Sequence, residues 1–510
     1  MRHRRIAWIV VAVLLAASPA AAHRSSSPQC FQDPPARNSE GPPEDDGFWE
    51  EIVDIGQMGI HAIHLPTGKL LFWGYNVGGT QPGAIAGKLY DADTNVGTNI
   101  ELPHPAFCGG HTHLTDGKIL IAGGFGRTAT ESVTYDPFTN TWGPIIKMYA
   151  GRYYPTLTTI ADGRVFVASG TGGRSSTPEI FDPATATWSP LGCIPGTTVC
   201  RNARLRNHYY TRTTQGPDER LFTIPASRDN WAHTFDLDTE LWTRHTIGNE
   251  ALGKMTPSPG VYYAPGKMLL AGADFYGPAT RASDQASVVE FADSLNPTLR
   301  AIAPMAYARN RNSLTLLADG KVLVTGGIRN APCAGPASPF VYHPELWDPA
   351  TEQWETLGPM QEDRVYHSTA LLLHDGSVIV AGGENNHTTA QVFRPPYLFK
   401  GPRPVVTGMP TEIKLGQSFD VLTPDAANVA QVNLLRLGAA THAYDENQRI
   451  VRLPFIAGAG KVTVDGPTSP YDAPPGYYML FLISDLGVPS LTATGVSNYV
   501  PVRPFDWGGP

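Results

Sequence analysis

Short runs of alternating apolar and polar positions, each opened by a tight turn, recur along most of this chain. Seven segments share a turn, usually with glycine, then a largely apolar run and small residues: 67–75, 116–124, 162–170, 218–226, 265–273, 319–327 and 375–383. Their starts lie 46 to 56 residues apart. Alternation with a period of two predicts β-strands, and the flanking Gly and Asp residues predict turns. Each repeat therefore predicts one small antiparallel sheet.

A second marker, a turn that usually leads to a large aromatic residue, interleaves with the first. It occurs at 90–95, 135–142, 181–188, 235–242 and 347–354. A period near fifty with paired glycines is typical of kelch repeats, whose sheets bury their faces only against neighbouring repeats. Seven copies predict an all-β fold with a seven-bladed kelch β-propeller over residues 46–400. An open β-sandwich would not explain the regular period.

The pattern changes after the proline-rich segment 390–404. Alternating strands continue to residue 505, but the kelch markers stop. Residues 401–505 are therefore predicted to form a separate immunoglobulin-like β-sandwich.

The start of the chain predicts export. Residues 1–22 combine a basic beginning, an apolar run and three alanines, which is the pattern of a secretory signal peptide. The apolar run is too short to span a bilayer, and no later stretch is long and apolar enough. We therefore expect a secreted, extracellular protein without a membrane span. Residues 23–45, rich in Pro and Ser, are expected to be a loose lead-in.

Charge argues against a nucleic-acid partner. The formal charge is −8, and it becomes more negative once the signal peptide with its three arginines is removed. No basic run remains that could contact phosphates. We expect a monomer.

Five cysteines are present, which leaves one without a disulfide partner. Cys193 and Cys200 enclose a short loop, and a disulfide between them is predicted in an exported chain. Cys30 and Cys333 could form a second pair, but the sequence leaves that connectivity open. Cys108 is the cysteine for which we expect a different fate.

The phase of the repeats indicates which residues meet at the centre of the propeller. Ligands of propellers generally gather where the innermost strands converge. Polar, aromatic or reactive residues stand eight positions before the first residue of five of the seven turns, with Tyr366 one step before the last of them: Cys108, Tyr154, Tyr210, Arg311 and His367. These side chains are predicted to share one small volume.

Three longer motifs carry a family resemblance. They are R-x-Y-P-T around Tyr154, V-Y-H-S at 365–368 and T-H-A-x-x-x-x-Q-R at 441–449. With Cys108 upstream and PPYLF at 395–399, the chain resembles the copper-radical oxidases, the group of galactose oxidase and glyoxal oxidase, over essentially its whole mature length.

The resemblance implies a copper centre with a protein-derived radical. Tyr154 and His367 would be equatorial ligands, Tyr366 the axial ligand, and His442 the remaining protein ligand, carried by a hairpin of the second domain. A thioether between Tyr154 and Cys108 would hold the radical.

Elementary chemistry agrees with this assignment. Two imidazoles and two phenols form a tetragonal nitrogen and oxygen set that suits Cu(II). Oxidation of an alcohol or aldehyde removes two electrons, whereas copper takes one, so a second one-electron centre is needed. A tyrosine with an ortho thioether can serve because sulfur delocalises the unpaired electron. Tyr366 can accept the substrate proton as a general base.

The expected activity is oxidation of a small aldehyde or primary alcohol by O2, with H2O2 as the second product. A glyoxal-oxidase type is preferred for two reasons. Galactose oxidase stacks a tryptophan over its cross-linked tyrosine, but segment 169–176 has none, and its additional carbohydrate-binding domain is missing here. The alternatives are a galactose-oxidase-like sugar alcohol oxidase and a non-catalytic extracellular kelch binding module, because a fold does not fix a function.

Several further residues have weaker assignments. Tyr210 and Arg311 share the central phase and are predicted substrate contacts. His111 and His113 alternate on one strand and, like His61 and His208, are more simply interpreted as core residues. Trp73 and Trp231 could replace the missing stacking tryptophan, but the sequence does not place them.

Overall fold

The computed structural model of this chain is built almost entirely of strands. It describes residues 41–75, 85–125, 129–172, 177–192, 209–224, 231–247, 259–273, 282–329, 339–384 and 387–504. Helical structure in these ranges includes α1 (Pro43–Asp46) and the short 3-10 turns Pro396–Phe399 and Ala426–Asn428. The all-β expectation is confirmed. The predicted signal peptide and nearly all of the lead-in lie outside the described residues.

Six sheets follow one another along the chain, one for each of the first six repeats. The first contains β3 (His61–His64), β4 (Leu70–Trp73), β5 (Ile85–Asp91) and β6 (Val96–Leu102). The second contains β7 (Gly110–His113), β8 (Ile119–Ala122), β9 (Glu131–Asp136), β10 (Thr141–Trp142) and β11 (Ile146–Lys147). The third contains β12 (Thr156–Thr159), β13 (Val165–Ala168), β14 (Glu179–Asp182) and β15 (Thr187–Pro190). The fourth contains β16 (Arg212–Gln215), β17 (Leu221–Ile224), β18 (Trp231–Asp236) and β19 (Leu241–Thr246). The fifth contains β20 (Gly260–Ala264), β21 (Lys267–Ala271), β22 (Ala286–Glu290) and β23 (Thr298–Ala301), and the sixth contains β24 (Ser313–Leu316), β25 (Val322–Thr325), β26 (Glu345–Asp348) and β27 (Gln353–Thr356).

The seventh sheet joins the two ends of the repeat region. It combines β28 (Ser368–Leu372), β29 (Val378–Gly382) and β30 (Thr389–Arg394) with β1 (Phe48–Trp49) and β2 (Val53–Asp54). Trp49 pairs with Phe393 across this sheet and is fully buried. Strands from both ends of the repeat region thus close the ring of sheets, as propellers require.

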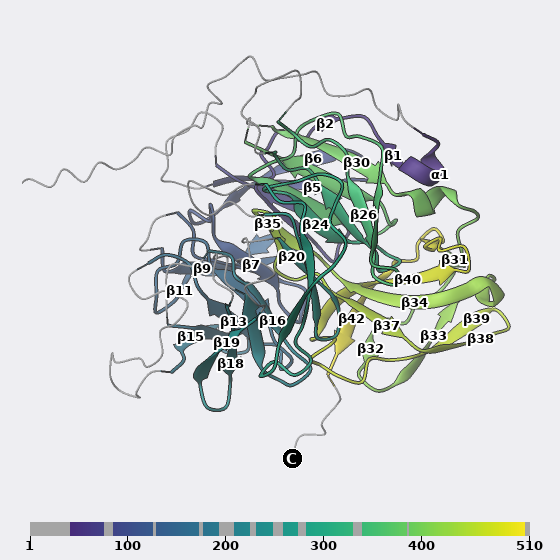
Figure 1. Cartoon of the computed structure of the whole chain (residues 1–510). Coiled ribbons are helices and arrows are strands. Elements are labelled where there is room, and N and C mark those ends of the chain that lie inside the picture. The colour runs from purple at the N-terminus through teal and green to yellow at the C-terminus, as the bar shows by residue number, and fades with distance from the viewer. Residues whose placement is uncertain are drawn as a thin grey trace, which may run out of the picture.

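Burial explains the composition of the inner strands. In β8 and β25 every residue is buried, whereas the outermost strand β27 is largely exposed. A strand covered on both faces by neighbouring sheets needs apolar side chains throughout, and alternation is retained only further out. Figure 1 shows the sheets arranged around a common centre.

The turn glycines of the repeats adopt the conformation that the pattern predicts. Gly117, Gly163 and Gly320 have φ between 87° and 89°, where a side chain is disfavoured. In the fourth repeat Glu219 takes this place with φ 74°. The sequence segment 218–226 is therefore a true repeat although its glycine is missing.

The C-terminal part forms a second β-domain beside the propeller, in green and yellow in Figure 1. One sheet contains β32 (Ile413–Lys414), β42 (Tyr499–Arg503), β40 (Gly476–Ser484), β34 (Val429–Arg436) and β37 (Ile450–Leu453). A second contains β33 (Ser418–Leu422), β39 (Lys461–Asp465) and β38 (Phe455–Gly458), and β31 (Val405–Val406) pairs with β41 (Leu491–Thr492). Leu434, Val464 and Leu480 are fully buried in a shared core. The predicted fold class, a propeller followed by a β-sandwich, is confirmed.

One hairpin of the second domain belongs to a propeller sheet. It consists of β35 (Ala439–Thr441) and β36 (Tyr444–Asp445), and β35 pairs with β3 so that Thr441 lies opposite His61. This pairing places the residues after Thr441 among the inner strands of the propeller.

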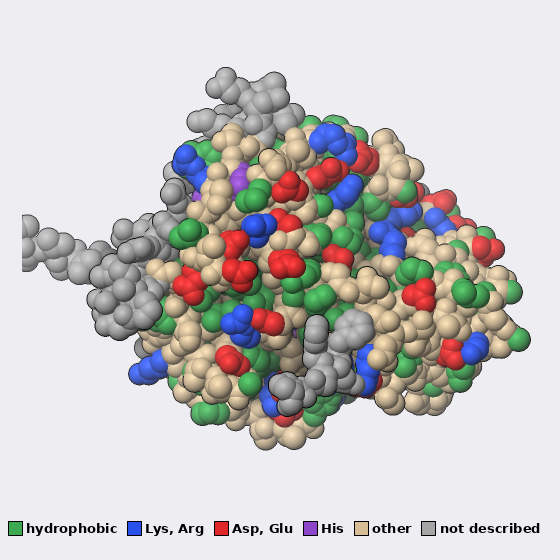
Figure 2. Space-filling model, turned by 90° about the horizontal axis from the view of Figure 1, so that it is seen from below, with side chains coloured by type: hydrophobic (Ala, Val, Ile, Leu, Met, Phe, Trp, Pro, Cys, Tyr) green, Lys and Arg blue, Asp and Glu red, His purple; other side chains and the backbone are tan. Residues whose placement is uncertain are grey.

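Charged side chains are interspersed on the face shown in Figure 2. Exposed pairs on the surface include Lys461 with Asp420, 2.6 Å apart. Such pairs contribute little to stability each. Among the described residues, no helical segment has the length and apolarity needed to cross a bilayer.

Candidate metal centre

The five residues selected by repeat phase are structurally equivalent. Each lies one or two positions before an innermost strand, and each has a positive φ, between 39° and 67°: Cys108, Tyr154, Tyr210, Arg311 and His367. Positive φ is uncommon for residues other than glycine. Its recurrence in five sheets means that one backbone design turns the chain at the entrance of each inner strand.

Hydrogen bonds between successive sheets hold this conformation. The amide of Tyr154 donates to the carbonyl of Cys108 at 2.9 Å, and the amide of Tyr210 donates to the carbonyl of Tyr154 at 3.0 Å. The amide of Arg311 donates to the carbonyl of Ala273 at 2.9 Å. At Cys108 the acceptor is a side chain instead, because its amide donates to Nε2 of His61 at 2.9 Å.

His442 reaches the same volume from the second domain. It follows β35 directly, has φ 49° and is buried. Its Nδ1 lies 2.6 Å from Oγ1 of Thr441, which donates to the carbonyl of Ile60 at 3.0 Å. The imidazole is therefore oriented by contacts with both domains, and its Nε2 faces the centre.

The rest of the hairpin is fastened to inner strands of the propeller. Glu446 accepts hydrogen bonds from the amides of Leu157 at 2.6 Å and His111 at 3.4 Å. Gln448 both accepts from the amide of Leu316 and donates to its carbonyl, at 2.9 and 3.0 Å. These side chains use backbone groups that face the channel, so the hairpin is fixed on two sides of it.

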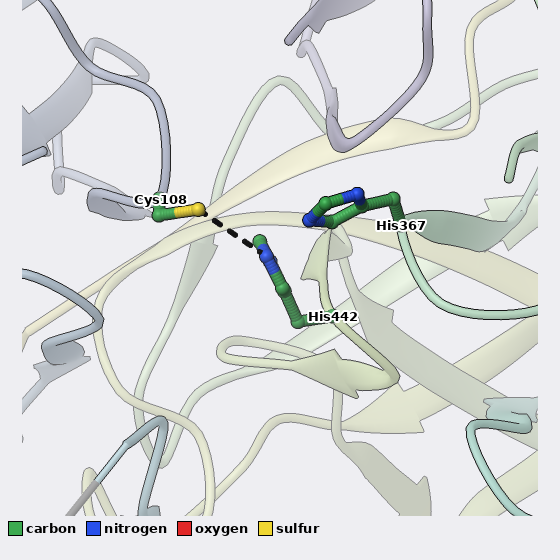
Figure 3. Close-up of side chains that lie close together, drawn as sticks. All are labelled: Cys108, His367 and His442. Carbon is green, nitrogen blue, oxygen red and sulfur yellow. Dashed lines mark hydrogen bonds between the residues drawn. The ribbon is translucent and has the colours of Figure 1, made fainter. Parts of the chain in front are cut away.

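Cys108, His367 and His442 point toward one another, as Figure 3 shows. Their possible ligand atoms all lie within 4.8 Å of one another, and Cys108 Sγ is 3.4 Å from His442 Nε2. The hydroxyls of Tyr154 and Tyr366 are 3.2 Å apart. The ring of His442 lies 5.2 Å from that of Tyr154 and 5.1 Å from that of Tyr366. The structure thus brings together all five residues that the sequence placed at the metal.

Burial keeps these groups neutral in the absence of a metal. Burial, with smaller effects from neighbouring Cys108 and Tyr366, raises the pKa of Tyr154 far above its usual range. Burial likewise raises the pKa of Tyr366 and, together with nearby His367, lowers the pKa of His442 well below 6.5. A bound cation would reverse this for the phenols by displacing their protons.

The donor set fits copper. Two imidazoles and two phenols around one volume match the tetragonal nitrogen and oxygen geometry of Cu(II). Cys108 with the two histidines alone would suit a softer ion, but burial raises the pKa of its thiol, an effect that the neighbouring Tyr154 and Tyr153 offset only in part. Both tyrosines pack against the apolar cluster that contains Cys108.

Among the described residues, the rings of three tyrosines lie around that of Tyr154. The ring of Tyr153 lies 4.1 Å away at an angle of 49°, and that of Tyr209 lies 5.0 Å away, edge-on. Trp73 stacks on His61 instead, and Trp231 is exposed beside Arg244. Neither tryptophan takes the stacking role considered from the sequence. Tyr153 and Tyr209 were missed, although a Tyr-Tyr pair at the same phase of two repeats signalled them.

The two predicted substrate contacts have different surroundings. Tyr210 is buried, and its hydroxyl donates to the carbonyl of Gly109 at 3.0 Å. The guanidinium of Arg311 lies 5.2 Å from the ring centre of Tyr366, and its Nη1 is 2.8 Å from a carboxylate oxygen of Glu384. Only Arg311 of the two therefore has a partly exposed polar end beside the centre.

The buried histidines differ from one another. His113 has its two ring nitrogens against the carbonyl of His64 and the amide of Asn447, as expected for a core residue. His61 contacts the metal centre through Cys108. Burial, helped by the neighbouring histidines His111, His442 and His367, lowers the pKa of His61 well below 6.5.

His208 lies outside the described residues, as do Cys193, Cys200, Cys30 and Cys333, so both disulfides stay predictions.

Known proteins resemble this chain in sequence over one or both domains. Residues 403–495 match the family model of the galactose oxidase-like early set domain. Galactose oxidase of Gibberella zeae is 27% identical over 488 residues, covering 88% of this chain and 70% of that protein. Aldehyde oxidase GLOX of Vitis pseudoreticulata is 32% identical over 219 residues, covering 37% of this chain and 41% of that protein.

A solved structure extends the likeness over both domains. A fungal alcohol oxidase of the AA5 family, solved in complex with copper, superposes with a TM-score of 0.76 at 25% identity and covers 90% of this chain and 100% of that one. Family model, relatives and structural neighbour point to the same family. The chain is similar to the copper-radical oxidases, the family of galactose oxidase and glyoxal oxidase.

Proposed function

We propose that this protein is a secreted oxidase that uses one copper ion and a tyrosyl radical to oxidise a small aldehyde or primary alcohol with O2. The convergence of Tyr154, Tyr366, His367, His442 and Cys108 in one volume carries this proposal. An alcohol would give the aldehyde and H2O2, and an aldehyde would consume water and give the acid and H2O2. Either reaction removes two electrons and two protons from the substrate.

The positions of these residues assign them different roles in the reaction. His442 is buried, whereas Tyr154, Tyr366 and His367 are only partly buried, so the centre opens on their side. Bound copper would supply one of the two one-electron acceptors, and the Tyr154 radical would be the other. The hydroxyl of Tyr366, 3.2 Å from that of Tyr154, can take the substrate proton. The nearby guanidinium of Arg311 favours the anionic form of Tyr366.

The thioether between Cys108 and Tyr154 belongs to the same proposal. The thiol loses one hydrogen, an ortho carbon of the tyrosine ring loses another, and a carbon–sulfur bond forms. The two electrons and two protons pass to O2, which becomes H2O2. The packing of Tyr154 against the cluster that contains Cys108, and the hydrogen bond from its amide to the Cys108 carbonyl at 2.9 Å, support this bond.

Aromatic side chains on the open side favour a small, weakly hydroxylated substrate. The ring centre of His367 lies 5.8 Å from that of Phe107 and 6.2 Å from that of Tyr75. Phe125 adjoins Phe107 and is partly exposed. A sugar would need many polar partners at such a rim. This supports a glyoxal-oxidase type. The galactose-oxidase type remains the second candidate because the galactose oxidase match covers 88% of the chain and the aldehyde oxidase match 37%.

A substrate panel tests the proposal. Purified, copper-loaded protein would be assayed for peroxide with glyoxal, methylglyoxal, galactose and simple primary alcohols, with metal-free protein as the control. We expect peroxide with at least one aldehyde, faster than with galactose. Tryptic peptides should show Cys108 and Tyr154 joined with the loss of two hydrogens. No peroxide on any substrate despite bound copper would contradict the oxidase and favour the binding module.

A further inference from the structure

His61 stands out because it replaces a backbone acceptor at one position of a repeated design. The amides of Tyr154, Tyr210 and Arg311 each donate to a backbone carbonyl. The amide of Cys108 donates instead to Nε2 of His61, at 2.9 Å, in a fully buried contact. Among these four amides the exception is that of Cys108, one of the two residues of the series that would join in the thioether.

We propose that His61 is a positioning residue that holds Cys108 in the conformation from which it bonds to Tyr154. This inference rests on the proposed function, because it assumes that the thioether forms. Since Nε2 accepts a hydrogen bond, the neutral imidazole carries its proton on Nδ1. His61 touches neither the reacting carbon nor the thiol in any contact that we describe, so its effect passes through the Cys108 backbone.

The ring of His61 is itself fixed. It stacks on the indole of Trp73 with the centres 4.8 Å apart and the planes 3° from parallel. The ring of His111 lies at a steep angle to that of His61, with the ring centres 5.3 Å apart. His61 also pairs in register with Thr441, the residue before His442. The stacking contact with Trp73 and the strand pairing with Thr441 together fix the position of His61 Nε2.

Cys108 needs such support because its conformation is unfavourable. Its φ of 57° costs on the order of 1 kcal/mol or more for a residue with a side chain. Its carbonyl accepts from the amide of Tyr154 at 2.9 Å, so His61 on one side and Tyr154 on the other hold both of its peptide groups. In this conformation Cys108 Sγ lies 3.4 Å from Nε2 of His442, and Tyr154 packs against the apolar cluster that contains Cys108.

Loss of the His61 acceptor should slow formation of the thioether rather than the later oxidation of substrate. A buried amide without a partner is costly, so Cys108 would relax toward a more ordinary φ and move Sγ away from the tyrosine ring. The step itself stays as written above: one hydrogen from sulfur, one from the ring, and O2 reduced to H2O2. Molecules that do form the bond should turn over normally.

Two variants and a control separate this role from general stability. His61→Leu removes the acceptor, whereas His61→Gln can still offer an amide oxygen to the Cys108 amide. His104→Leu is the matched control, since His104 is equally buried but bonds to the carbonyl of Gly123. Metal-free protein would receive copper and air, and the fraction of linked peptide would be followed by mass spectrometry.

We expect His61→Leu to form the link at least about tenfold more slowly, in the range of other residues that orient metal-site groups. His61→Gln should recover part of the rate, and His104→Leu should match the parent. In metal-free protein, His61→Leu should also make Cys108 react faster with iodoacetamide. Peroxide production per linked molecule should be unchanged.

Linking and alkylation at parental rates in a folded His61→Leu protein would overturn the inference alone. If His61→Leu does not fold, His61→Phe takes its place as the variant without an acceptor. A faster linking rate in His61→Gln than in His61→Phe supports the acceptor role, and equal rates in the two overturn it. A parent protein that never forms the link overturns the proposed function and this inference with it.

Discussion

The hairpin that carries His442 depends on one buried carboxylate, and its removal gives a sharp prediction. Glu446 has a side chain with no exposed surface and accepts from two backbone amides, those of Leu157 and His111. Glu446→Ala would leave both amides buried without that acceptor. The change lies four residues from His442, so both folding and metal binding should respond.

The magnitude follows from the two hydrogen bonds. Each buried donor left without a partner costs about 1–3 kcal/mol. The bond to Leu157 is short at 2.6 Å and should count fully, whereas the bond to His111 at 3.4 Å is weak. We therefore expect Glu446→Ala to lower the free energy of unfolding by about 2–4 kcal/mol. Glu446→Gln keeps one acceptor oxygen and should lose about half as much.

Urea unfolding and copper titration would measure the two effects. Copper affinity should fall about 10–100-fold in Glu446→Ala, because a loosened hairpin no longer orients His442. Glu355→Ala, at an exposed carboxylate on β27, is the control and should change stability by less than about 0.5 kcal/mol. Parental stability together with parental copper affinity in Glu446→Ala would refute the idea that Glu446 anchors the hairpin.

Three further predictions concern charge and the radical. Burial disfavours the charged form of His387, but hydrogen bonds to Asp363 and Glu362 outweigh it and raise its pKa to about 9. The stability it contributes is complete below pH 6.5 and lost as pH rises through 9, so His387→Gln should flatten unfolding free energy over that window, by at most about 3 kcal/mol; an unchanged pH slope would contradict this. Tyr154→Phe should abolish peroxide production without unfolding the protein, and full activity in that variant would defeat the radical mechanism. Glu384→Gln removes the negative charge that pairs with the Arg311 guanidinium beside the centre and should raise kcat/KM for the anionic aldehyde glyoxylate relative to methylglyoxal severalfold; an equal ratio in parent and variant would show that this carboxylate does not select against anions.

Much of the propeller could be predicted because each repeat carries its own local signal. A turn glycine, an apolar run and an aromatic marker specify one sheet, and equal phase then places Cys108, Tyr154 and His367 together. The signal survives even where Glu219 replaces the glycine, since the apolar run still fits a doubly covered strand.

Other parts of the site depend on contacts between distant segments. The sequence around His61 does not show that its ring accepts a hydrogen bond from the Cys108 amide, because β3 and the cysteine lie in different sheets. The sequence around Trp73 does not show that its indole stacks on His61. The sequence likewise does not distinguish Glu446 from an ordinary turn carboxylate, because its amide partners at Leu157 and His111 are distant in the chain. Tyr153 and Tyr209 precede Tyr154 and Tyr210 in the chain, but the sequence does not show that both of their rings contact Tyr154.

The pairing of β35 with β3 ties the metal centre to the order in which the molecule is made. His442 follows Cys108 by 334 residues, so the two meet only when nearly the whole chain has been synthesised. Contacts between such distant residues form late and slowly. A nascent chain that has completed only the propeller lacks this imidazole, and the site is finished when the second domain docks. Stable copper loading is thus a marker that both domains have folded and joined.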